Sequence, residues 1–167
     1  MKDVVLGQYK GIEFPAQLKG REKEDYLMKI LVESSKAKVS ESSVNERAKR
    51  MTEEYALRLT QQGLSIEQYY EASKTDEKAL VKKMQGIAKS QLKGKMILEA
   101  IAEKENITVT QQDVDTEIKK LTMRYPLDEK KIREIMQGAE ERRLKKDILT
   151  RKAMDFVSEH AVEAATV

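Results

Sequence analysis

Residues 39–55 read VSESSVNERAKRMTEEY, and residues 109–125, seventy positions later, read VTQQDVDTEIKKLTMRY. In each stretch a valine is followed by a hydroxylated residue, Ser40 or Thr110, and the last residue is a tyrosine. Serine and threonine are strongly preferred as helix N-caps. The apolar residues that follow recur in steps of three and four, which is the spacing of one face of an α-helix. The sequence therefore predicts the same capped, amphipathic helix twice.

The likeness extends upstream into the preceding helical pattern. Aligned without gaps at this offset, residues 26–55 and 96–125 share six identities in thirty pairs. The identical pairs are Glu33/Glu103, Val39/Val109, Val44/Val114, Lys49/Lys119, Thr52/Thr122 and Tyr55/Tyr125. Both windows are predicted to fold as a helix, a turn and a second helix, with no strand. Since an arm with one apolar stripe cannot bury itself, we expect the two arms to pack on a body, on each other or on another molecule.

Helical patterns continue through most of the remaining chain. SIEQ (65–68) has the form of a capping box and predicts a short helix near the end of the first arm. Thr75 is the expected cap of a long helix over roughly 76–104, and Asp128 of another short helix. A last helix is expected over 139–160, followed by a frayed tail at 161–167.

Two glycines, Gly86 and Gly94, lie inside the predicted long helix. Each costs about 1 kcal/mol relative to alanine in a helix interior. Close packing against a neighbouring helix is the expected reason for both.

Residues 1–18 differ from the rest because they contain β-branched and aromatic residues, two glycines and a proline. This pattern is typical of a short extended segment. We therefore divide the chain into an extended, linker-like segment at 1–18 and a helical domain at 19–167.

The composition favours an elongated all-α protein. The 167 residues are 40% hydrophobic and 37% charged, with a net charge of +3. Average proteins have about 45–50% apolar and about 25% charged residues, so this chain has less core and more surface than a sphere needs. Seven glycines and two prolines are few for the many turns of a sandwich or barrel.

The sequence contains no recognisable catalytic or cofactor motif. Cysteine is absent, and the single histidine, His160, lies near the expected frayed end, so neither a nucleophile with its base nor a metal site is predicted. Glycine-containing stretches lack the spacing of a phosphate-binding loop. The N-terminal residues contain no apolar run of signal-peptide length, and no segment approaches the ~18 apolar residues of a membrane span. We expect a cytoplasmic protein without enzymatic activity, cofactor or membrane partner.

Two basic clusters, RAKR (47–50) and RRLKK (142–146), raise the alternative of nucleic-acid binding. Glutamate or aspartate flanks both clusters at helical spacing. We interpret them as solvated helix faces and rank a nucleic-acid role last.

Methionine is the residue type that a packed core explains least well. The chain has eight methionines and six tyrosines, several of them near the predicted arm ends. Methionine is flexible and polarisable, and it is common on surfaces that bind varied apolar partners. Met28 and Met96 are expected to fill the core, whereas Met123, Met136, Tyr69 and Tyr70 are equally compatible with an exposed binding surface.

Three stretches carry a family resemblance: VNERAKRMTEEYALRLTQQGLSIEQYYEAS (44–73), MILEAIAEKENITVTQQDVDTEI (96–118) and LKKDILTRKAMDFVSEHA (144–161). With them, residues 26–161 resemble the C-terminal chaperone domain of bacterial trigger factor. The most specific parts are QQGLSIEQYY, LEAIAEKENITVT and RKAMDFV. VVLGQYKGIEF (4–14) resembles the family segment that links the ribosome-binding and isomerase domains.

The resemblance implies a helical body with two arms that cradle unfolded polypeptide, a fold similar to the SurA peptide-binding domain. The family's ribosome-docking motif, G-F-R-x-G-K-x-P, and its FKBP-like prolyl isomerase domain have no counterpart in the sequence. Neither direct ribosome docking nor isomerase activity is therefore expected.

The leading hypothesis is an ATP-independent holdase whose partners are unfolded or nascent polypeptides. The alternative is a structural module that forms a homodimer through its arms. The hypothesis places a discontinuous apolar cradle near the arm turns, at Met51, Tyr55, Leu59, Leu64, Tyr69, Tyr70, Met123, Tyr125, Leu127, Ile132 and Met136. Burial of these residues in a core is the competing interpretation, most strongly for Met51 and Tyr55.

Overall fold

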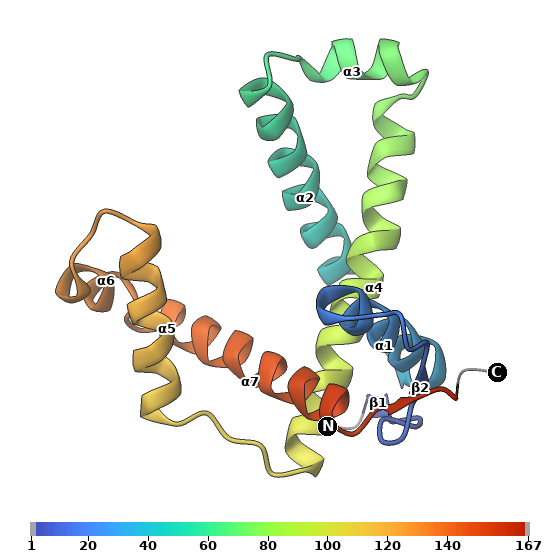
Figure 1. Ribbon diagram of the computed structural model, residues 1–167. Helices are drawn as coiled ribbons and strands as arrows, with labels where there is room; N and C mark the ends of the chain where they lie inside the picture. Colours follow the sequence, from blue (N-terminus) through green and yellow to red (C-terminus); the bar gives the residue numbers. More distant parts are fainter. Residues whose placement is uncertain (1–2, 166–167) are drawn as a thin grey trace.

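Two long helices, α4 (Glu77–Lys104) and α7 (Ala139–Glu159), each begin at the end of a projecting arm and finish in a shared body (Figure 1). The computed structural model describes residues 3–165. Arm 1 is built from α2 (Glu41–Gln61), α3 (Ile66–Ser73) and the first half of α4. Arm 2 is built from α5 (Gln111–Arg124), α6 (Glu129–Ile135) and the first half of α7. The predicted all-α body with two protruding arms is confirmed.

The body consists of α1 (Gly20–Ser34), the ends of α4 and α7, and the N-terminal segment. Its most deeply buried large side chains are Leu27, Leu31, Ile97, Ile101 and Val157. These residues come from all three helices, so the body holds the arms at their roots.

Each arm has a small apolar core of its own. In arm 1, Ala48 of α2 packs with Leu80, Met84 and Ala88 of α4. In arm 2, the core joins Val114 and Ile118 of α5 to Ile132 of α6 and Ile148 of α7. The stripe of each arm is therefore covered by the returning helix of the same arm, and neither needs another partner to be buried.

The N-terminal segment is extended, as predicted, but it packs into the body. Tyr9, Ile12 and Phe14 are buried in the body core. The Tyr9 hydroxyl donates to Glu105 Oε1 at 2.7 Å. The interpretation of residues 1–18 as linker-like did not anticipate this burial, because the contacts are made with helices far away in the sequence.

Four two-residue strands fix this segment in place. β1 (Val4–Val5) pairs antiparallel with β3 (Lys36–Ala37), and β2 (Glu13–Phe14) pairs parallel with β4 (Val162–Glu163). The expectation that residues 161–167 fray is wrong for β4, which satisfies its backbone on β2; residues 166–167 lie outside the described part.

The two windows of the predicted repeat share helix boundaries but not connectors. α1 ends at Ser34 and α4 at Lys104, while α2 begins at Glu41 and α5 at Gln111, so both boundaries keep the offset of seventy. The expectation of no strand is wrong in the first window, where β3 pairs with β1. The second connector instead turns through Asn106, whose φ is 54°. The duplication itself therefore stays a prediction.

Most helix starts follow the expected capping chemistry. Thr75 is the exception, because α4 begins one residue later: the Asp76 carboxylate accepts from the Ala79 amide at 2.7 Å. Side-chain caps are present at Ser40, Ser65, Thr110 and Asp128, and those at Ser65 and Thr110 are complete capping boxes.

The two helical glycines of α4 have different explanations. A Cβ added to Gly94 would lie 3.0 Å from Met28 Sδ, so α1 packs directly on this position, as predicted. A Cβ added to Gly86 would meet no atom of residues 3–165 within 4 Å. The expectation of close packing is therefore wrong for Gly86.

Candidate functional site

The end of arm 1 is an aromatic cluster that bridges α2 and α3. Gly63, with φ at 78°, turns the chain after α2, and the capping box of Ser65 and Gln68 starts α3 across the arm end. The rings of Tyr55 and Tyr69 meet edge to face, with centroids 5.2 Å apart and planes at 76°. Such aromatic pairs add about 0.5–1.5 kcal/mol beyond their area burial. The cluster therefore holds α3 on α2, and both tyrosines are half-buried.

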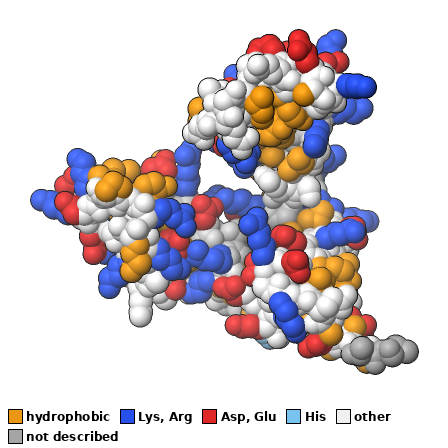
Figure 2. Space-filling view, turned by 45° about the horizontal axis from the view of Figure 1, so that its top comes forward, with side chains coloured by type: hydrophobic (Ala, Val, Ile, Leu, Met, Phe, Trp, Pro, Cys, Tyr) orange, Lys and Arg blue, Asp and Glu red, His pale blue; other side chains and the backbone are white. Residues whose placement is uncertain are grey.

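The end of arm 2 exposes apolar side chains more fully. α5 ends before Tyr125, because Pro126 cannot follow a residue in helical conformation without a clash. Met123 in the last turn of α5 is 87% exposed, and Tyr125 and Leu127, which follow the helix, are 51% and 42% exposed. Figure 2 shows hydrophobic side chains gathered at the ends of both arms. Exposed apolar groups this close together are typical of an interaction surface.

The eleven residues of the predicted cradle fall into three groups. Leu64, Met123, Tyr125 and Leu127 are exposed. Half-buried members pack against an arm core: Met51, Tyr55, Tyr69 and Tyr70 in arm 1 and Met136 in arm 2. Leu59 and Ile132 are only 7% and 4% exposed, so their inclusion in an accessible surface is wrong for this conformation. Ile132 belongs to the arm 2 core, facing α5 and α7.

Three exposed apolar residues on the arms were not predicted from the sequence. Leu57 of α2 is 60% exposed, Ile135 of α6 is 51% exposed, and Ile87 of α4 is 38% exposed. Leu57 lies two positions from Tyr55 and Leu59, which places it on the opposite side of the helix from their stripe. An apolar residue on the polar face of an amphipathic helix is the signal that would have found it.

The two basic clusters meet in a cleft between the roots of the arms. The cleft has a volume of about 540 Å³ and is lined by Arg47, Arg50, Gln91, Leu92, Lys95, Arg143 and Asp147. Its cations have acidic neighbours: Lys95 lies 3.2 Å from Asp147, and Arg143 lies 3.1 Å from Glu140. Arg50 likewise lies 3.4 Å from Glu46. This interleaving supports the interpretation of the clusters as solvated helix faces.

Ion pairs also connect α5 to the other helices of arm 2. The Arg151 guanidinium donates to Glu117 at 2.6 Å and lowers the pKa of that carboxyl. Hydrogen bonds from Gln111 and then from Arg133 lower the pKa of Asp115. Arg133 lies 2.9 Å from Asp115 and joins α6 to α5. These contacts orient the arm end but do not form a reactive centre.

His160 lies at the end of α7 and stacks on Phe156, with ring centroids 4.1 Å apart. Its Nδ1 lies 2.8 Å from the Phe156 carbonyl oxygen, which is a local contact within one helical turn. Within residues 3–165, no group of three or more histidine or acidic side chains is arranged to hold a metal ion. In the same residues, no helix combines the length and apolar character that crossing a bilayer requires.

The arrangement of body and arms is matched by a known family. Residues 16–159 match the model of the bacterial trigger factor C-terminus. The chain belongs to the trigger factor family. The trigger factor of Agathobacter rectalis is 34% identical over 143 residues, which cover 86% of this chain and 32% of that protein. The trigger factor of Geobacillus kaustophilus is 33% identical over 153 residues, covering 89% and 35%. The chain thus spans about a third of the length of the curated relatives it matches.

Two solved trigger factor structures share the fold. A structure of trigger factor domains from Thermotoga maritima matches with a TM-score of 0.62 at 16% identity, covering 93% of both chains. A second trigger factor, described for promiscuous substrate recognition in folding and assembly, matches with a TM-score of 0.54 at 16% identity. That match covers 83% of this chain and 33% of the other.

Proposed function

We propose that this chain is an ATP-independent holdase module that binds unfolded or nascent polypeptides. The observation that carries the proposal is the exposure of apolar side chains at the ends of both arms, chiefly Met123, Tyr125, Leu127 and Leu64. The arms are held apart by the body and have cores of their own, so these side chains are available without any opening of the fold.

Weak contacts at several points suit a chaperone that must release its clients without ATP. Full burial of a leucine or methionine contributes about 1.5–3 kcal/mol, so partial burial against a client contributes about half of that. Several such contacts together reach micromolar affinity, which corresponds to about −8 kcal/mol. Each contact remains individually easy to break.

The proposal concerns the module and not the whole activity of the longer relatives. We assign the chaperone domain to residues 19–167, and the packing of Tyr9, Ile12 and Phe14 in the body core supports a close association of the N-terminal segment with it. The family match covers the C-terminal domain, which is not itself the isomerase domain. We therefore propose a non-enzymatic role and a cytoplasmic location, with unfolded chains as the partners.

An aggregation assay tests this function. A chemically unfolded model client is diluted with increasing amounts of the protein, light scattering is followed, and the titration is repeated as salt is raised. Suppression of scattering that persists at moderate salt supports apolar holdase binding. Suppression that disappears steeply with salt indicates charge-driven binding, as for nucleic acid. Absence of suppression, together with a stable dimer in sedimentation, favours the structural alternative.

A further inference from the structure

The cleft between the roots of the arms concentrates positive charge where α2, α4 and α7 meet (Figure 1). Four cations line it: Arg47, Arg50, Lys95 and Arg143. Among the described residues that line it, Asp147 is the only carboxylate. With four positive groups and one negative, the lining has a net charge of +3, as large as that of the whole chain.

The acidic partners of the three arginines do not line the cleft. Glu46, Glu54 and Glu140 lie 3.4, 3.8 and 3.1 Å from the arginines with which they pair, but none of them is a lining residue. Ion pairs between exposed side chains contribute little to stability, so they are readily exchanged for other partners. Arg50 and Arg143 are both exposed, and their guanidinium groups are therefore accessible to an anionic group in the cleft.

The cleft continues into a small apolar pocket beside α1. Gln91 and Lys95 line both the cleft and the pocket. The pocket has a volume of about 320 Å³, and Met28 of α1 and Leu98 of α4 give it apolar walls. We refer to the cleft and this pocket together as the fork site. A partner that fits the fork site presents an apolar group next to negative charges.

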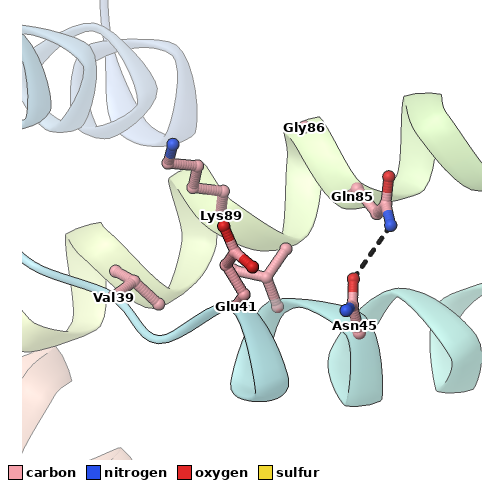
Figure 3. Close-up of a pocket in the computed structure, with 7 residues that line it drawn as sticks. Val39, Glu41, Asn45, Gln85, Gly86 and Lys89 are labelled. Atoms are coloured by element: carbon pink, nitrogen blue, oxygen red, sulfur yellow. Dashed lines mark hydrogen bonds between the residues drawn. The ribbon is translucent and has the colours of Figure 1, made fainter.

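The hollow between α2 and α4 in arm 1 lacks this character (Figure 3). Glu41 and Lys89 line it with opposite charges. Its two side-chain amides are bonded to each other, because Gln85 Nε2 donates to Asn45 Oδ1 at 2.9 Å. The excess of positive charge therefore belongs to the fork site and is not shared by this neighbouring hollow.

We infer that the fork site binds segments of unfolded polypeptide in which an apolar residue is flanked by aspartate or glutamate. The apolar side chain occupies the pocket, and the carboxylates pair with the cations of the cleft. The inference rests on the proposed function and adds a preference for one class of client. Arginine suits this role because its guanidinium group matches the geometry of a carboxylate.

A nucleic acid fits the same site less well. Single-stranded nucleic acids bind to platforms of aromatic side chains on which their bases stack. Within the described part of the chain, no aromatic residue lines the cleft or the pocket. The apolar pocket also offers nothing to a phosphate backbone.

Three fluorescein-labelled peptides of equal length test the preference by fluorescence anisotropy. Each has a central leucine, which is flanked by glutamates, by glutamines or by lysines. At low salt the parent should bind the glutamate peptide about 5–20-fold more tightly than the glutamine peptide, the size expected of a few partly exposed ion pairs. This difference should shrink as salt shortens the screening length from about 10 Å at 0.1 M to about 3 Å at 1 M. Equal binding of the glutamate and glutamine peptides overturns the inference.

Charge reversals in the cleft have a matched control on the same two helices. Arg50→Glu with Lys95→Glu removes positive charge from the cleft. Lys49→Glu with Lys89→Glu changes the net charge of the chain equally, at positions that do not line it. The cleft pair should lose the preference for the glutamate peptide, and the control pair should keep most of it. Loss in both pairs would assign the preference to the net charge of the chain and overturn the inference.

Crosslinking locates the site in the parent protein, where no substitution affects the fold. The central leucine of the glutamate peptide is replaced by a photo-reactive analogue, and the crosslinked residues are identified by mass spectrometry. They should be residues of the pocket, chiefly Met28, Gln91 and Thr150. Crosslinks confined to the arm ends would overturn the inference. An oligonucleotide of equal charge should displace the peptide poorly, and efficient displacement would assign the cleft to nucleic acid instead.

The inference about the fork site and the proposed function fail differently. If the parent binds no unfolded protein, the holdase proposal itself is wrong. If the parent binds an unfolded protein but shows no preference for the glutamate peptide, only the inference about the fork site is wrong.

Discussion

Lys152 Nζ of α7 lies 2.7 Å from Asp113 Oδ2 in the first turn of α5. The same carboxylate accepts from the Thr110 amide at 2.8 Å and from the Thr110 hydroxyl at 2.9 Å. Lys152 also donates to the Thr108 carbonyl at 2.9 Å. One carboxylate therefore completes the cap of α5 and joins it to the helix that carries arm 2 back to the body.

Acid should weaken this junction. The Lys152 ammonium, followed by the Thr110 hydrogen bonds, lowers the pKa of Asp113 from 3.8 to about 2. A lowered folded pKa means that the contribution to stability is present above pH 3.8 and is lost as the pH falls towards 2. Melting temperatures of Asp113→Asn should therefore depend less on pH between 4 and 2 than those of the parent.

Asp128→Asn is the control for this measurement. Asp128 caps α6 through the Lys131 amide, and asparagine is an equally good cap. At neutral pH, Asp128→Asn should therefore melt with the parent, which would show that an asparagine cap alone costs little stability. An Asp113→Asn profile that parallels the parent over this range would show that the junction contributes no measurable stability.

Local chemistry made the arms predictable from the sequence. Ser40, Ser65 and Thr110 cap their helices through residues three positions away, so the signal lies within one turn of the chain. The burial of Tyr9 and Phe14 could not be read in this way. Tyr9 bonds Glu105, ninety-six residues later, and no pattern near Tyr9 indicates this partner.

The candidate surface was only partly predictable for a related reason. Met123 and Ile132 are both apolar residues near the end of arm 2, yet Met123 is 87% exposed and Ile132 is buried in the arm core. The difference depends on how α6 folds back on α5 after Pro126, which the composition of the arm end does not specify. Gly86 and Gly94 likewise cannot be told apart from the sequence. Only Gly94 faces α1, and that contact depends on how the helices pack.

Enlarging Gly94 should force α1 and α4 apart. A Cβ there lies 3.0 Å from Met28 Sδ, so the rest of a leucine side chain has no room. Gly94→Leu should cost about 1–3 kcal/mol by overpacking, and thermal melts measure this loss. Met28→Ala in the same chain opens space and should restore part of the stability. If Gly94→Leu melts with the parent, the contact between these helices is looser than the distance indicates.

Prolyl isomerase activity should be absent. The matched family model is that of the trigger factor C-terminus, and the arms and body contain helices and two-residue strands within residues 3–165. A protease-coupled proline-peptide assay should give the uncatalysed rate at every protein concentration. A rate that rises in proportion to added protein, and that persists after further purification, would contradict this expectation.

Replacing the half-buried cradle residues should affect stability as well as binding. Tyr69 and Tyr70 pack against the core of arm 1, and Met136 packs against that of arm 2. Changing all three to serine should lower the melting temperature by several degrees, because each large-to-small change removes packing in an arm core. A triple variant that melts like the parent but binds clients poorly would assign these residues to the client surface alone.

The exposed end of arm 2 should separate binding from folding most cleanly. Met123, Tyr125 and Leu127 face solvent, so Met123→Ser, Tyr125→Ser and Leu127→Ser together should leave the melting temperature within about 1–2 °C of the parent, as surface changes usually do. Each side chain contributes about 1 kcal/mol to client binding when partly buried, so the triple variant should bind an unfolded client about 10–100-fold more weakly.

Ile132→Ala is the matched comparison on the same arm. Because Ile132 is buried, this change should lower stability by about 2–5 kcal/mol. The triple variant should thus melt with the parent but suppress aggregation poorly. Ile132→Ala should melt at a lower temperature but suppress aggregation as the parent does, at temperatures where both variants are folded. A triple variant that is folded and suppresses aggregation as well as the parent would remove arm 2 from the client-binding surface.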